Sequence, residues 1–100
     1  MILEIGEKLK VMRESERITS RREAAEILGI PGNALWRYET GEAIPKGDVI
    51  MKILSNPRFE KYALWFVTGK TAPESGQIEP ALAHLAQGHA EKNEDDQKAG

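Results

Sequence analysis

The sequence predicts an all-α fold, and three observations carry that prediction. Apolar residues recur at helical spacing near the amino end, between residues 2 and 12. Two short segments of helical pattern then flank a tight Gly–Ile–Pro turn at residues 29–31. Further on, residues 62–67 are apolar or aromatic at every position. Together these features predict five helices within residues 1–69, then a short docking helix and a flexible acidic tail.

The first helix is predicted from about Ile2 to Glu14. Ile2, Ile5, Leu9 and Met12 recur at spacings of three and four, which places them on one face of a helix. This apolar stripe is expected to pack across the two helices that follow. Met12 is therefore interpreted as a core residue and not as a cofactor ligand.

The central stretch predicts two short helices, Arg21–Leu28 and Gly32–Glu39, joined by a turn. Ser20 or Thr19 can cap the first of these helices, and the glutamate three positions after Ser20 completes the pattern of a capping box. Gly29 tolerates the positive φ that ends a helix. Pro31 cannot continue that helix but suits the first position of the next one.

The two central helices have complementary inner faces. Ala24, Ala25 and Leu28 lie on the inner face of the first helix, and Leu35 and Tyr38 lie on that of the second. The small alanines allow the helices to approach closely. This arrangement is a helix-turn-helix, in which the second helix is offered to the major groove of DNA.

Two more helices are predicted after a polar loop. Asp48 is expected to cap a helix over Val49–Ser55. Asn56 is then expected to cap the fifth helix, with Pro57 at its first position. That fifth helix is predicted over residues 58–68 and ends at a glycine.

The fifth helix is apolar on every side, although an outer helix normally has a polar face. Phe59, Ala63 and Phe66 can cover the core, so Tyr62 and Trp65 are left for a second partner. A homodimer contact is the preferred interpretation, and burial by the chain's own carboxyl-terminal segment is the alternative. The predicted interface residues are Tyr62, Leu64, Trp65, Phe66, Ile78, Leu82 and Leu85.

The segment after the fifth helix divides into two parts. Residues 70–88 form an extension that begins with an extended stretch rich in Pro, Gly and Ser. It continues as a short helix over Pro80–Gln87, with Leu82 and Leu85 pointing inward, which must dock because it is too short to be stable alone. Residues 89–100 are polar and acidic, and a disordered tail is expected.

Composition excludes several classes of function. The chain has no cysteine, so disulfides and thiolate metal sites are excluded, and no metal or cofactor is predicted. No catalytic constellation can be assembled from the sequence, so an enzyme is not expected. No apolar run approaches a membrane span, which favours a cytoplasmic protein. The net charge is −2, but no acidic residue lies between Ile27 and Tyr38, so a local basic face remains available.

The central stretch resembles the Cro and repressor-like helix-turn-helix domains of phages, the lambda repressor-like family. The residues in register with that motif include Ser20, Ala25, Leu28, Gly29, Ile30, Leu35, Arg37, Tyr38, Glu39 and Gly41. Arg21, Pro31 and Trp36 depart from it, where glutamine, a capping serine and a small residue are usual. Losing the serine cap leaves an irregular start to the second helix.

The resemblance implies a DNA-binding surface. Arg21 and Arg22, at the start of the first motif helix, would contact phosphates. The residues facing the bases would be Gly32, Asn33, Trp36 and Arg37, with Thr40 and Lys46 on flanking phosphates. Competing structural interpretations remain open. Trp36 could be buried against the first helix, Asn33 could cap its own helix, and Arg37 could pair with a nearby glutamate. Glu39 is interpreted as structural, holding Arg22 or the following loop.

The carboxyl-terminal half narrows the resemblance. The segments NPRFEKYALWF and TAPESGQIEPALAH are similar to the immunity repressor C family of Peduovirus-type temperate phages. That resemblance implies a one-domain homodimer that binds operators in an early promoter, acts on DNA in the bacterial host and maintains lysogeny. It also implies a chain without an autoproteolytic domain, and a phage-encoded antirepressor as a candidate partner.

Two other classes remain alternatives at this point. A small autoregulator of the antitoxin or restriction-controller type would share the helix-turn-helix and the dimer. A helical interaction module without DNA binding is compatible with the balanced charge and the apolar fifth helix. Substituting Arg21 and Arg37 separates these classes, because a pure interaction module would be insensitive to the change.

Overall fold

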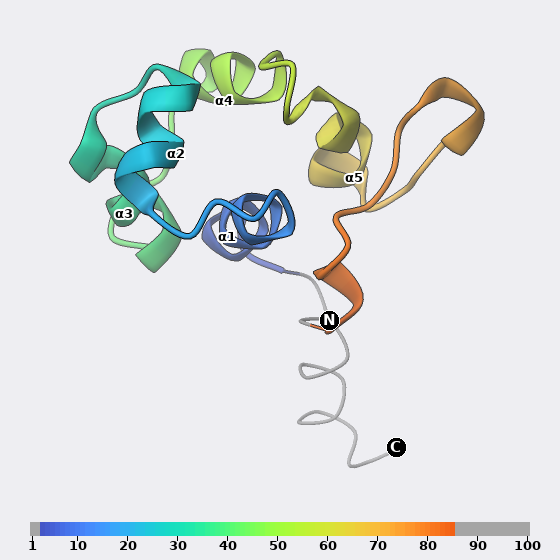
Figure 1. Ribbon diagram of the computed structural model, residues 1–100, viewed down its shortest axis with the longest axis horizontal. Coiled ribbons are helices and arrows are strands. Elements are labelled where there is room, and N and C mark those ends of the chain that lie inside the picture. Colours follow the sequence, from blue (N-terminus) through green and yellow to red (C-terminus); the bar gives the residue numbers. More distant parts are fainter. Residues whose placement is uncertain (1–2, 86–100) are drawn as a thin grey trace.

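The structure is a computed structural model, and it describes residues 3–85 (Figure 1). Helices make up most of this part of the chain, which confirms the predicted all-α fold. In chain order the elements are α1 (Ile5–Ser15), α2 (Arg21–Leu28), α3 (Gly32–Thr40), α4 (Gly47–Leu54), the 3₁₀ turn η1 (Glu60–Tyr62), α5 (Ala63–Thr68) and the 3₁₀ turn η2 (Pro73–Ser75). The predicted tail over residues 89–100 lies outside the described residues.

Helix α1 begins at Ile5, three residues later than predicted. Glu4 precedes the helix, and its backbone N–H donates to the carboxylate of Glu7 over 2.8 Å, which fixes the start. Leu9 and Met12 are buried in the core as expected. Ile5 is 38% exposed, so its predicted place in the buried stripe was wrong.

Helices α1 and α3 approach each other closely at Gly6. A Cβ atom built on Gly6 would lie 2.3 Å from the backbone oxygen of Tyr38 and 2.9 Å from that of Glu39. Only a residue without a side chain leaves room for the α3 backbone at this point. Gly6 therefore sets how α1 lies across the helix-turn-helix.

The chain leaves α1 through a left-handed residue that is not glycine. Arg17 has a φ of 63°. The backbone N–H of Ile18 then donates to the carbonyl of Arg13 over 3.1 Å, and that of Arg17 donates to Glu14 over 2.9 Å. These two bonds close a Schellman motif, and Ile18 turns into the core, where it is 2% exposed.

The helix-turn-helix has the predicted boundaries at its turn. The hydroxyl of Ser20 accepts a bond from the N–H of Glu23 over 3.2 Å, and Gly29 ends α2 at a φ of 75°. Pro31 lies at the N-cap of α3 and not at its first position, and no side chain caps this helix. The inner faces meet as predicted, because Ala24, Ala25 and Leu28 are buried, as is Leu35.

Helix α4 starts two residues earlier than predicted. Lys46 is the N-cap residue, so Asp48 falls in the first turn instead of capping the helix. Its carboxylate accepts a bond from the adjacent Val49 N–H over 3.0 Å.

The predicted fifth helix is shorter than expected. Residues 58–62 form turns and η1, and α5 starts only at Ala63. Asn56 does not cap α5. Its side-chain amide donates to the carbonyl of Ile27 over 2.9 Å, while its side-chain oxygen accepts from the N–H of Arg58. Asn56 therefore ties the end of α2 to the turn that precedes α5.

The chain's own core covers the aromatic residues of this region. Phe59, Tyr62, Trp65 and Phe66 are each no more than 7% exposed. Lys8 of α1 reaches the carboxyl end of α5, where its ammonium donates to the carbonyl of Phe66 over 2.8 Å. The prediction that Tyr62 and Trp65 need a second partner was wrong, since they are already buried within one chain.

The carboxyl-terminal extension folds back onto α1 and α5. A small hairpin around η2 is closed by a bridge between Ala72 and Gln77, and it projects from the body beside α5 (Figure 1). The Gln77 side chain accepts from the N–H of Leu64 and donates to the carbonyl of Glu60, both at 2.9 Å. These bonds satisfy backbone groups near the start of α5.

The last described residues dock with a different face from the one predicted. Pro80 and Ala83 are buried, whereas Leu82 is 37% exposed and Leu85 54% exposed. The backbone N–H of Leu82 donates to the hydroxyl of Ser15 over 3.0 Å. The inward orientation predicted for the two leucines was wrong. Residues 83–85 are helical, whereas residues 80–82 are not, and residues 86–87 of the predicted helix lie outside the described residues.

Candidate nucleic-acid interface

Helix α3 presents an exposed face made of the residues predicted to meet DNA. Leu35 is buried and Tyr38 is half-buried, so the opposite side of the helix faces outward. Trp36 is 47% exposed, which excludes its burial against α1. The other exposed residues on the helix are Gly32, Asn33, Arg37 and Thr40.

The start of α3 is open. No heavy atom lies within 4 Å of a Cβ built on Gly32, and its φ is in the ordinary negative range. Within residues 3–85, no hydrogen bond holds the side chain of Asn33, so it does not act as the missing cap. A planar amide in this position can give two hydrogen bonds to an adenine edge.

Arg37 has a weak local partner. Its Nε lies 3.7 Å from a carboxylate oxygen of Glu42, and both side chains are at least half exposed. An ion pair of this length in water contributes little, so Arg37 can exchange it for a phosphate or a guanine. Thr40 donates its hydroxyl to the carbonyl of Arg37 over 3.2 Å, which leaves the hydroxyl oxygen to accept.

Glu39, on the inner side of α3, links two arginines. Arg13 of α1 donates from Nε to Oε2 over 2.7 Å and from Nη2 to Oε1 over 3.1 Å. Arg21, the first residue of α2, donates from Nε to the same Oε1 over 2.8 Å. The Glu39 side chain is 0% exposed, so a single buried carboxylate joins α1, α2 and α3.

This cluster corrects the role predicted for Glu39. The residue is structural, as expected, but its partners are Arg13 and Arg21 instead of Arg22 or the loop. Arg13 is 5% exposed, and its Nη1 donates to the carbonyls of Ile18 and Thr19. Sequence reasoning missed Arg13, because its partner lies 26 residues away and no local pattern marks the pair.

Further cations surround α3. Arg22, next to Arg21 in α2, is exposed, and so is Lys46 at the start of α4. Lys52 of α4 donates its ammonium to the carbonyl of Gly29 over 3.1 Å, at the end of α2. Lys52 was not among the residues predicted to bind DNA, although its positive charge lies next to the turn of the motif.

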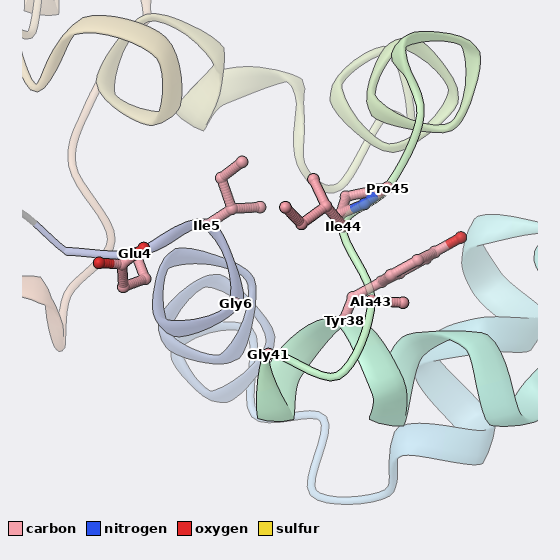
Figure 2. A pocket seen from close by; sticks show the side chains of 8 residues that line it. All are labelled: Glu4, Ile5, Gly6, Tyr38, Gly41, Ala43, Ile44 and Pro45. Atoms are coloured by element: carbon pink, nitrogen blue, oxygen red, sulfur yellow. The ribbon is translucent and has the colours of Figure 1, made fainter.

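A shallow hollow of about 310 Å³ lies between the start of α1 and the loop after α3. Figure 2 shows Ile5 and Ile44 pointing toward each other across it, beside Tyr38 and Pro45. Its lining carries one ionisable carboxylate, Glu4, which is not a set that could perform acid–base chemistry.

Within residues 3–85 there is no group of three or more His, Asp or Glu side chains arranged to hold a metal ion. Among the helices of the same residues, none has the length and apolar character needed to cross a membrane.

Comparison with known proteins identifies the same helix-turn-helix that the structure shows. The helix-turn-helix domain family matches residues 4–55, which include α1 to α4. Over 96 residues the chain is 47% identical to repressor protein C of Escherichia phage P2, and the match covers 96% of each chain. This chain belongs to the helix-turn-helix family that includes repressor protein C. The relative is named as a repressor and not as an enzyme, which agrees with the sequence-based expectation.

Membership of the helix-turn-helix family indicates which helix of the motif faces DNA. In a helix-turn-helix the second helix of the motif reads the major groove, and the first lies across the backbone. Here α3 is that second helix, and the exposed Trp36 and Arg37 lie on it. The matched region ends before α5, so the aromatic core after residue 55 lies outside the domain match and inside the match to repressor protein C.

Proposed function

We propose that this chain is a DNA-binding transcriptional repressor that binds operators in a phage early promoter and maintains lysogeny. The observation that carries the proposal is the outward face of α3, where Asn33, Trp36 and Arg37 are exposed on a helix without acidic residues on that side. Amide, aromatic and guanidinium groups are those that read base edges and phosphates. The protein would act on DNA in the cytoplasm of the bacterial host, with an antirepressor as a candidate antagonist.

We further propose that the repressor acts as a homodimer. One α3 helix presents few base-reading groups, and two copies on one site give the affinity that specific binding requires. Exposed apolar side chains remain on α5 and the extension: Val67 at 68%, Ile78 at 41%, Leu82 at 37% and Leu85 at 54%. We therefore propose that the dimer surface consists of exposed residues from 70–85 and the outer side of α5, while the buried Tyr62, Trp65 and Phe66 belong to the core beneath it.

A salt titration of DNA binding tests the function. Affinity for the DNA upstream of the chain's own gene should fall steeply with salt, and should exceed the affinity for a scrambled duplex about a thousandfold. Arg37→Ala should weaken binding, while Lys10→Ala, an exposed cation on α1 outside the predicted DNA surface, serves as the matched control. Equal and weak binding to both duplexes would exclude the repressor function and favour an interaction module.

A second comparison separates the repressor from an antitoxin-type autoregulator. Both would bind upstream DNA as dimers, so binding alone does not distinguish them. The upstream region should contain an early promoter that the chain shuts off in a reporter assay. Neutralisation of a co-expressed neighbouring toxin would instead support the antitoxin type.

A further inference from the structure

The carboxylate of Glu39 holds Arg21 at the point where α2 meets the surface. Arg21 is the first residue of α2, and its side chain is 36% exposed. Only its Nε is engaged among the hydrogen bonds of the described residues, and the acceptor is Oε1 of Glu39 over 2.8 Å. The two Nη groups at the end of the side chain therefore remain available to a ligand outside the chain.

The charges of Arg13, Glu39 and Arg21 together favour the binding of an anion. Arg13 is buried, and it already pairs with Glu39 through two hydrogen bonds of 2.7 and 3.1 Å. The negative charge of Glu39 is thus balanced before Arg21 is counted. Arg21 then adds a second positive charge beside the same carboxylate, at the amino end of α2, where the helix dipole is also positive.

From this arrangement we infer that Glu39 is a positioning residue for DNA binding: it orients the guanidinium of Arg21 toward a backbone phosphate. The inference rests on the proposed DNA-binding function and extends it to a residue that is itself inaccessible to DNA. An arginine that is free in solution loses rotamer freedom when it binds phosphate. An arginine already held through Nε loses less, so its phosphate contact is stronger.

A thermodynamic cycle tests this role. Arg13→Met/Glu39→Met replaces the buried pair with apolar residues of similar length, a change that proteins often tolerate. Arg21→Gln is then made in the native chain and in this background, and affinity for the upstream duplex is measured. We expect Arg21→Gln to weaken binding about tenfold in the native chain and about twofold in the background.

Arg22→Gln is the matched control. Arg22 is the exposed neighbour of Arg21 in α2, and Glu39 does not contact it. Its effect on affinity should be the same in both backgrounds. If the double variant does not fold, as checked by circular dichroism, Arg13→Leu/Glu39→Leu replaces it as the background, since it likewise leaves no acceptor for Arg21 at position 39.

The outcomes separate this inference from the function on which it rests. An equal cost of Arg21→Gln in both backgrounds overturns the positioning role and leaves the repressor function intact. A larger cost in the background overturns it too, since Glu39 would then compete with the phosphate for Arg21. If the native chain binds neither the upstream duplex nor the scrambled duplex, both proposals are overturned.

Discussion

Arg13 and Glu39 form a buried two-bond ion pair between α1 and α3, with N–O distances of 2.7 and 3.1 Å. Gly6 lies on the same side of α1 and allows the backbones of the two helices to approach closely. The orientation of the DNA-facing helix therefore depends on one residue with no side chain and one buried charge pair.

Removing one member of this ion pair should lower the free energy of unfolding more than removing both members. Arg13→Met alone leaves the carboxylate of Glu39 buried without its two-bond partner, and we expect a loss of about 3–5 kcal/mol in the free energy of unfolding. Arg13→Met/Glu39→Met should recover most of that loss. Urea denaturation of the two variants measures both values, and equal stabilities would contradict the prediction.

Gly6→Ala should destabilise the fold. The added methyl group would overlap the Tyr38 carbonyl oxygen, and forcing the helices apart should cost about 1–3 kcal/mol. Gly32→Ala is the matched control, because the space around its Cβ is empty. Thermal unfolding should show a lower Tm for the first variant and an unchanged or higher Tm for the second. A native-like Tm for Gly6→Ala would show that α1 can shift freely.

Base-reading residues should affect affinity and leave stability unchanged. Asn33→Ala and Trp36→Ala remove exposed side chains, so the free energy of unfolding should change by no more than about 0.5 kcal/mol. Affinity for the upstream duplex should fall about tenfold for Asn33→Ala. The salt dependence of binding should stay as in the native chain, because a neutral side chain releases no counterions. An equal loss of affinity for the upstream and the scrambled duplex would assign Asn33 to the DNA backbone instead of the bases.

Stability should fall at acid pH because of Glu16. Its carboxylate accepts bonds from Lys61 over 2.8 Å, Tyr62 over 2.5 Å and Arg58 over 3.3 Å. Burial by itself raises the pKa of Glu16, but these bonds outweigh it and hold the pKa below the usual 4.5. The stabilisation is therefore complete above the pKa of the unfolded chain and is lost as pH falls through that of the folded chain. Glu16→Gln should flatten this part of the curve of stability against pH.

Tyr62 should give stability the opposite pH dependence, with a loss at high pH. Burial, together with the hydrogen bond to Glu16, raises the pKa of the Tyr62 hydroxyl above its usual 10.0. The folded chain then keeps a proton that the unfolded chain releases, so stability should fall as pH rises beyond about 10. Tyr62→Phe should remove this fall. A fall of the same size in the variant would assign it to other groups.

The apolar surface of the extension should determine oligomeric state. Leu82→Ser and Leu85→Ser remove exposed apolar side chains and should shift the chain from dimer to monomer in sedimentation. Met51→Ser, at a 68% exposed position on α4, is the control and should leave the dimer intact. A monomeric native chain at micromolar concentration would contradict the dimer proposal directly.

Local chemistry explains why the helix-turn-helix could be predicted so closely. Helix α2 has the predicted limits because Ser20 caps it and Gly29 ends it, and both signals act within a few residues. The exit from α1 could not be predicted in this way, because Arg17 takes the left-handed conformation where glycine is usual. The fifth helix was overestimated because Asn56 bonds to α2, a partner that its own segment does not reveal.

The sequence by itself determined the all-α class, the limits of α2 and the family resemblance. Each of these depends on residue spacing and on caps that act over one or two turns. Tertiary structure alone decided that Tyr62 and Trp65 are buried, that Leu82 faces outward, and that Glu39 binds Arg13 and Arg21. Those outcomes depend on contacts between distant segments, because burial and ion pairing are set by what packs against a side chain.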